Sequence, residues 1–242
     1  MMTTSFRRAF VGVTVAAIAA VGYGQSAVAA ERFEVERIKA VRPTLVDTAS
    51  ALQKGNVKAA KEAFAAFDSA WNGIEVYINT RDMEMYNALE RVMQAKLTEG
   101  LNGASPNAQD LLAQAKAMLA KFDEAIAMVG KAAPLNPLYD DVARLRIERA
   151  HLREVNPALK AGDLAKARKS FNEFEEGWDP IEDLVKIRSR EAYDAIEDGT
   201  FKIAQALKPA SPDVNQLTTL VSGVMDKYNT VVTQVTREAR GR

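Results

Sequence analysis

Two short helical motifs supply the residues of this sequence that could do chemistry. A Trp-x-x-Ile-Glu run is followed by a Tyr-x-x-x-Glu run, and this pair of motifs occurs twice along the chain. The carboxylates and phenols of the two pairs are Glu75, Tyr86, Glu90, Glu182, Tyr193 and Glu197. Carboxylate-rich sites inside four-helix bundles bind iron or other hard divalent ions. Each pair of motifs is therefore a candidate metal site of two carboxylates and one phenol.

The same residues also have a purely structural interpretation, because glutamates that flank the apolar stripe of a bundle helix are ordinary. In that interpretation the glutamates at 75, 84 and 90 form ion pairs with Arg81, Arg42 and lysines at the bundle edge. Tyr86 is then a core aromatic residue with its hydroxyl at the rim. Glu75 and Glu90 could face one bundle interior, but counting from the turn near residue 80 offsets them by more than one helical turn.

An internal repeat explains why the motifs occur twice. Without any gap, residues 55–90 match residues 162–197 at an offset of 107, and the two tryptophans of the chain, Trp71 and Trp178, fall on each other. Further along, Ser105-Pro106 matches Ser211-Pro212 once one residue is dropped. The repeat covers about 35–130 and 142–237, which is nearly the whole chain after its first 30 residues.

Each copy is expected to form four helices. Alanine, leucine, glutamate and lysine dominate the composition and favour helix. In the first copy, the periodicity and breaks predict helices over about 34–53, 57–78, 81–101 and 107–129. Gly55 ends the first helix and Asn56 caps the second, and Gly162-Asp163 repeats this chemistry. Thr80 is the expected cap of the third helix.

Short loops between these helices make successive helices antiparallel neighbours. The predicted fold is therefore all-α, with tandem duplicated antiparallel four-helix bundles over 30–130 and 142–242. Residues 131–141, with Pro134 and Pro137, form the expected linker. A single helical array that shares helices across the junction is the alternative. In the second copy, Pro180 predicts a kink or break in the helix that carries Trp178.

The first 29 residues resemble a cleavable secretory signal. Arg7 and Arg8 precede an apolar run over 10–20, and Ala27-Val28-Ala29 offers a small-x-small cleavage site. An uncleaved membrane anchor is the alternative. Because the chain has no cysteine, disulfides and thiolate metal sites are excluded. Export without cysteine favours a periplasmic location.

Charge and motif content exclude several classes of function. Without Arg7 and Arg8, 30 basic and 32 acidic residues remain, a net charge of −2 that gives no reason to expect a nucleic-acid partner. His151 is the only histidine, so sites with several histidine ligands are excluded. No nucleophile arrangement or glycine-rich phosphate loop occurs in the sequence, and we therefore expect no enzymatic activity.

The order of motifs resembles a known family. Gly-Asn or Gly-Asp, then Trp-x-x-Ile-Glu, then Tyr-x-x-x-Glu is similar to the helical periplasmic region attached to bacterial high-affinity iron permeases. A more distant similarity is to imelysin-like periplasmic proteins of iron uptake. The resemblance implies capture or transfer of a metal ion, iron above all, by the six motif residues. It also implies a membrane iron permease, or another periplasmic or membrane protein, as partner.

The sequence departs from both relatives. No permease membrane domain follows, and the Gly-x-His-x-x-Glu signature of imelysin-like proteins is absent. Two hypotheses therefore stand side by side. The first is a periplasmic metal-binding accessory protein of iron uptake or handling, and the second is a ligand-free helical interaction or scaffold protein.

Overall fold

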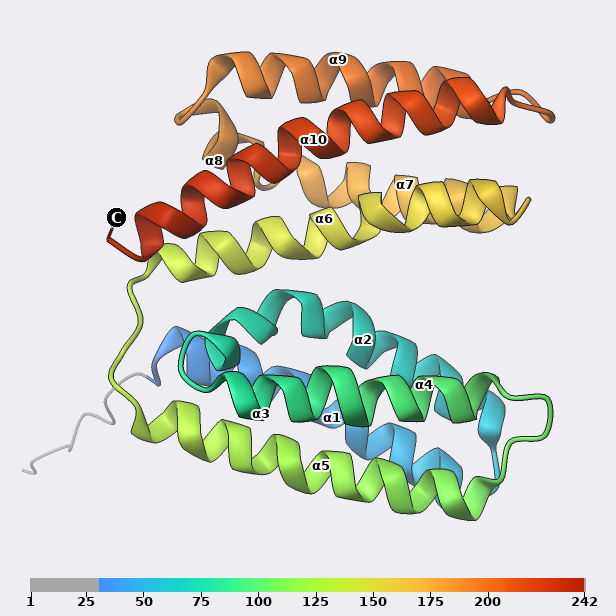
Figure 1. The fold of residues 1–242 in the computed structure, drawn as a ribbon, viewed down its shortest axis with the longest axis vertical. Helices are drawn as coiled ribbons and strands as arrows, with labels where there is room; N and C mark the ends of the chain where they lie inside the picture. The colour runs from blue at the N-terminus through green and yellow to red at the C-terminus, as the bar shows by residue number, and fades with distance from the viewer. Residues whose placement is uncertain (1–30, 242) are drawn as a thin grey trace, which may run out of the picture. The chain divides into compact units, whose positions relative to one another are not determined.

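Helices make up most of residues 31–241, the part of the chain that the computed structural model describes (Figure 1). Within these residues there is no β-strand, so the all-α class is confirmed. The predicted signal sequence lies outside the described residues. None of the described helices is both long and apolar enough to cross a membrane. The elements are α1 (Phe33–Gln53), α2 (Val57–Asn79), α3 (Met83–Asn87), the π-helix η1 (Ala88–Gln94), α4 (Ala95–Asn102), α5 (Ala108–Lys131), α6 (Leu138–Lys160), α7 (Leu164–Trp178), α8 (Glu182–Lys186), α9 (Arg190–Leu207) and α10 (Val214–Ala239).

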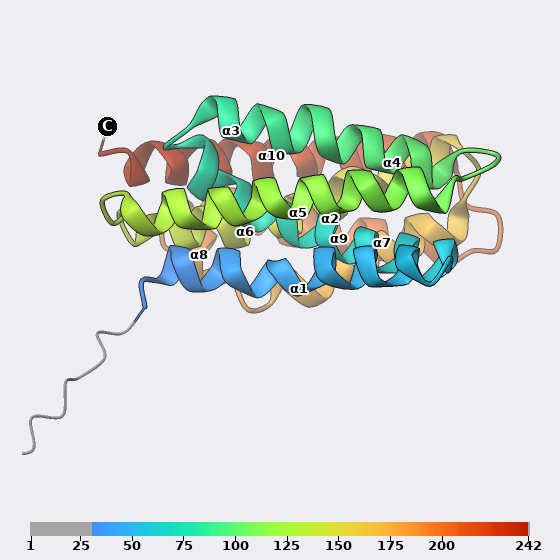
Figure 2. The same cartoon turned by 90° about the horizontal axis from the view of Figure 1, so that it is seen from below.

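The helices pack mostly against helices of their own copy. α1 packs against α2 and α5, and in the second copy α6 packs against α7 and α10 while α9 packs against α10. The long helices run side by side along one direction (Figure 2). A further contact, between α2 and α6, joins the copies, and the described residues 31–241 belong to one compact unit.

The predicted helix ends between the first two helices of each copy are confirmed. Gly55 and Gly162 adopt φ values of +69° and +74°, a left-handed conformation that costs glycine little. Asn56 and Asp163 then accept a hydrogen bond from the backbone N–H three residues later, at 3.0 and 2.9 Å. Identical turn chemistry therefore starts α2 and α7.

The predicted cap at Thr80 is wrong. Asp82 and Ser189, which match each other in the repeat, cap α3 and α9 by accepting from the backbone N–H of Met85 and Ala192. The Thr80 hydroxyl instead donates to the Val76 carbonyl, inside the last turn of α2. The chain makes an extra turn after α2, so the first extended residue that can cap is Asp82.

The helix predicted over 81–101 is helical without a break from Met83 to Asn102, but over Ala88–Gln94 it is a π-helix, η1, instead of an α-helix. At the start of η1, the buried residue Leu89 matches Ile196 at the offset of 107; after η1, Leu97 matches Ile203 at 106. A π-helix takes up one extra residue in a turn, because its hydrogen bonds span five residues instead of four. The single residue by which the first copy is longer is thus absorbed in η1.

An aromatic stack fills the centre of each copy. In the first copy, Phe67 lies 5.7 Å from Trp71 and from Phe122 between ring centroids. In the second, Phe174 lies 6.2 Å from Trp178 and 5.8 Å from the ring of residue 228. These side chains are almost fully buried, so the tryptophan of each motif belongs to the core.

The link between the copies is shorter than predicted. α5 ends at Lys131 and α6 starts at Leu138, inside the expected linker 131–141. Fully buried Glu34 holds the link, because its Oε1 accepts from Arg81 at 3.0 Å and from the Leu135 backbone N–H at 3.2 Å. Arg81 also donates to the Ala133 carbonyl. The link is therefore fixed to the first copy.

The contact between α2 and α6 depends on a glycine. A Cβ on Gly73 would lie 2.6 Å from Cδ1 of Ile147, so the Ile147 side chain fills the space that a larger residue on α2 would occupy. In the second copy the matching residue is Pro180, and α7 ends at Trp178 there, which confirms the predicted break. At this position of the repeat, the helix is thus continuous in the first copy (α2) and broken in the second (α7).

Gly73→Ala is expected to destabilise the protein by about 1–2 kcal/mol, because overpacking against Ile147 outweighs the gain in helix propensity. In an Ile147→Ala background the same change should become stabilising, since the space is then free. Urea unfolding of the four proteins measures both effects in one double-mutant cycle.

Gly223→Ala is the matched control. Gly223 lies within α10 and a Cβ there would meet nothing within 4 Å, so we expect a gain of about 0.5–1 kcal/mol. Equal effects of alanine at 73 and 223 would show that the α2–α6 contact does not need the glycine.

Candidate functional site

In the first copy, the three motif residues lie around one tryptophan. The Tyr86 ring stacks on Trp71 at 6.3 Å with an angle of 10° between the planes. The Tyr86 hydroxyl faces Glu75, and burial together with the negative charges of Glu75 and Glu90 raises the pKa of Tyr86 to about 12. Although Glu75 and Glu90 were expected to lie more than one helical turn apart, both are therefore close enough to act on the same hydroxyl.

Glu90 is a half-buried carboxylate with no bonded partner among residues 31–241. Burial first, and then the negative charge of Glu75, raise the pKa of Glu90. The Trp71 indole N–H lies near enough to favour the ionised form, but the described residues offer it no acceptor at hydrogen-bonding geometry. The Oε2 atom of Glu90 is buried and likewise has no hydrogen-bond partner there.

The second copy repeats this arrangement with one difference. Tyr193 stacks on Trp178 at 6.4 Å, and loss of solvent contact followed by the charges of Glu197 and Glu182 raise the pKa of Tyr193. Here the Trp178 indole N–H donates to Oε1 of Glu197. The structure therefore brings together all three predicted residues in each copy, and the tryptophan N–H donates to a carboxylate of the site only in the second.

The structural interpretation named the wrong partners for the glutamates. Arg81 pairs with Glu34, and Arg42 forms two hydrogen bonds with Asp123 at 2.6 and 2.9 Å. Glu75 instead pairs across the copies, with Nη1 of Arg146 on α6 at 2.8 Å. Sequence reasoning missed this pair, because its residues are 71 positions apart and belong to different copies.

Each cluster has a ligand set that suits a hard cation in composition. Within residues 31–241, no group of three His, Cys, Asp or Glu side chains could hold a metal ion. A metal ion would therefore need the phenol as a third ligand beside the two carboxylates. Carboxylate and phenolate oxygens are hard donors, and a cation between them would offset the repulsion that raises the pKa of Glu90.

Comparison of the chain with models of known protein families gave no match, and comparison with curated protein sequences gave none either. The resemblance to the iron-permease region therefore stays a prediction that rests on the motifs alone.

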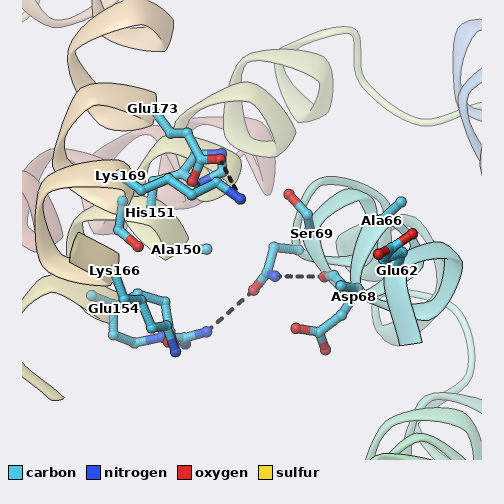
Figure 3. A pocket seen from close by; sticks show the side chains of 14 residues that line it. Glu62, Ala66, Asp68, Ser69, Ala150, His151, Glu154, Lys166, Lys169 and Glu173 are labelled. Carbon is cyan, nitrogen blue, oxygen red and sulfur yellow. Dashed lines mark hydrogen bonds and ion pairs between the residues drawn. The ribbon is translucent and has the colours of Figure 1, made fainter. Parts of the chain in front are cut away.

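A groove of about 610 Å³ lies between the copies, lined by α2, α6 and α7 (Figure 3). Figure 3 shows Lys166, Lys169 and Glu173 of α7 on one side and Asp68 of α2 on the other. Lys166 pairs with a glutamate of α6 at 3.0 Å, and Glu173 pairs with His151 at 3.4 Å. Most charges of this groove are thus satisfied by their neighbours.

A second buried carboxylate lies at the contact of α6 with α7. Oε2 of Glu148 is buried with no hydrogen-bond partner in the described chain, and it lies so close to Gly177 that a Cβ there would collide with it. Burial first, and then the negative charge of Glu173, raise the pKa of Glu148 to about 7. Sequence patterning gave no sign of this group.

Glu148→Gln is expected to stabilise the protein more at about pH 8 than at about pH 5. The unfolded chain releases the Glu148 proton near its ordinary pKa of 4.5, while the folded chain holds it to about 7. The contribution of Glu148 to stability is therefore complete below 4.5 and is lost as the pH rises through 7, whereas glutamine cannot ionise.

Urea unfolding at both pH values measures this difference. Glu154→Gln, a change on the same helix at a side chain that is 45% exposed, serves as the control and should show no comparable pH dependence. The same stability gap between Glu148→Gln and the unchanged protein at both pH values would contradict the raised pKa.

Proposed function

We propose that this protein is a periplasmic metal-binding accessory protein of iron uptake or handling. The observation that carries the proposal is that two carboxylates and one phenol converge beside the stacked tryptophan in both copies. Core packing accounts for the tryptophans, but it does not by itself account for two carboxylates whose negative charges raise the pKa of the neighbouring phenol in each copy.

The chemistry of the cluster favours a hard cation such as iron(III). Glu75, Tyr86 and Glu90 would hold it in the first copy, and Glu182, Tyr193 and Glu197 in the second. Binding would offset carboxylate repulsion and favour release of the phenol proton. With three protein oxygens, other coordination positions remain open to water or to a partner, which suits capture and release.

The partner and the location follow from the resemblance to the iron-permease region. A membrane iron permease, or another periplasmic or membrane protein, would receive the ion, and the signal-like residues 1–29 would direct export. No catalytic step is part of this role.

A ligand-free interaction protein is the second candidate, and one specific observation favours it. Glu75 already pairs with Arg146 at 2.8 Å, and both side chains are largely buried. In this reading the glutamate is a structural link between the copies, and the helix faces serve to bind a partner.

Calorimetric titration separates the two candidates. We expect the chain without residues 1–29 to give binding heat with iron, added as iron(II) or as an iron(III) chelate, and less with copper or zinc. Glu75→Gln and Glu182→Gln should each remove one site, and the double variant should approach background.

Glu84→Gln is the control, because Glu84 is exposed on α3 next to the first cluster and belongs to neither predicted site. It should leave the heat unchanged. Background heat for every ion with the unchanged protein would eliminate the metal-binding role and leave the interaction protein.

A further inference from the structure

We infer that the two sites are not equivalent, because Arg146 occupies the first site as a built-in cation and the second site therefore binds metal first. This inference rests on the proposed metal-binding function and specifies how that function is regulated. It is carried by three differences between the copies.

The first difference is the ion pair itself. Nη1 of Arg146 donates to Oε1 of Glu75 at 2.8 Å, and the side chains are only 17% and 13% exposed. Hydrogen bonds between charged groups are stronger than neutral ones, and solvent screens partly buried charges less. A metal ion at the first site must therefore displace a guanidinium that already neutralises Glu75.

The second difference is that the second copy has no such cation bonded to its site. The residue that matches Arg146 is Lys39, which pairs with Glu31 on the surface. Across residues 31–241 no ion pair forms to Glu182. Lys186 and Arg190 do lie over the Tyr193 ring, at 4.8 and 5.3 Å from its centroid, but they bond to neither carboxylate of the site.

The third difference is the orientation of the second carboxylate. In the second copy the Trp178 N–H holds Glu197. In the first, the corresponding atoms of Trp71 and Glu90 both lack a partner in the described chain, and the π-helix with its extra residue starts just before Glu90. A carboxylate that is already oriented loses less freedom when a ligand binds, which also favours the second site.

The order of binding has a structural consequence. Arg146 belongs to the second copy and Glu75 to the first, so their pair is part of the α2–α6 contact that joins the copies. A metal ion that enters the first site must break it. Metal binding at the first site is therefore coupled to the strength of the α2–α6 contact, while metal binding at the second site is not.

Terbium(III) is a suitable probe, because it is a hard cation whose luminescence is sensitised by nearby aromatic rings. Trp71 and Trp178 are the only tryptophans, and each stacks on the tyrosine of its own site. The chain without residues 1–29 is titrated as Trp71→Phe and Trp178→Phe variants. We expect the tight phase to be retained in Trp71→Phe and lost in Trp178→Phe.

Arg146→Gln in the Trp178→Phe background should then tighten binding at the first site by about ten-fold or more, since a charged hydrogen bond no longer competes. Arg146→Lys, which keeps the charge, should leave binding weak. Arg42→Gln removes an arginine from an ion pair with Asp123, away from the site, and should change nothing.

Several outcomes would overturn the inference. If both sites fill at the same metal concentration, or if the first site fills earlier, the inference is wrong. This result needs only the tryptophan variants, so the test does not depend on whether Arg146→Gln folds. An unchanged affinity in Arg146→Gln contradicts it as well, and in these cases metal binding itself stands. Absence of both terbium luminescence and iron heat would overturn the proposed function together with the inference.

Discussion

The close contact between α2 and α6 is the constraint on which the arrangement of the two copies depends. Gly73 lets the Ile147 side chain approach α2, and the neighbouring residue Arg146 then reaches Glu75. Apolar packing and a partly buried ion pair thus act on adjacent residues of one helix. Because a buried charge is costly without its partner, the pair also fixes the position at which the two helices meet. The joint between the copies and the chemistry of the first site therefore share the same few residues.

Duplication produced two copies with the same core, and later differences gave them different surroundings. Each copy keeps its tryptophan, its tyrosine and both glutamates. At the position of Gly73, however, the second copy has Pro180, which interrupts the helix and leaves no continuous surface for a further copy to pack on. The first copy alone absorbs an extra residue, in η1 beside Glu90. The array therefore has one internal joint and two chemically distinct clusters.

The parts of the structure that follow from local patterning were predictable from the sequence. The repeat, the helix ends at Gly55 and Gly162 and the gathering of each motif around its tryptophan depend on residues close together in the chain or on their periodicity. Arg146 was not predictable, because the register between α2 and α6 is set by side-chain packing across the copies. The π-helix was visible only as a shift of the offset from 107 to 106, which a loop could have absorbed equally well. The proposed metal-binding role itself rests on motifs and chemistry, not on packing.

The position of α6 explains why charged side chains gather at the joint. It packs against α2, α7 and α10, so little of its surface is left to solvent and its polar residues must meet other helices. Arg146 pairs with Glu75 on α2. Glu148 instead lies against the backbone of α7 at Gly177 and near the charge of Glu173, and its Oε2 has no hydrogen-bond partner in the described part of the chain. The Arg146–Glu75 ion pair stabilises the packing of α6 against the first copy. The buried Glu148 carboxylate destabilises the packing of α6 against α7 in its own copy. A cation that binds Glu75 in place of Arg146 would thus weaken the packing of α6 against α2.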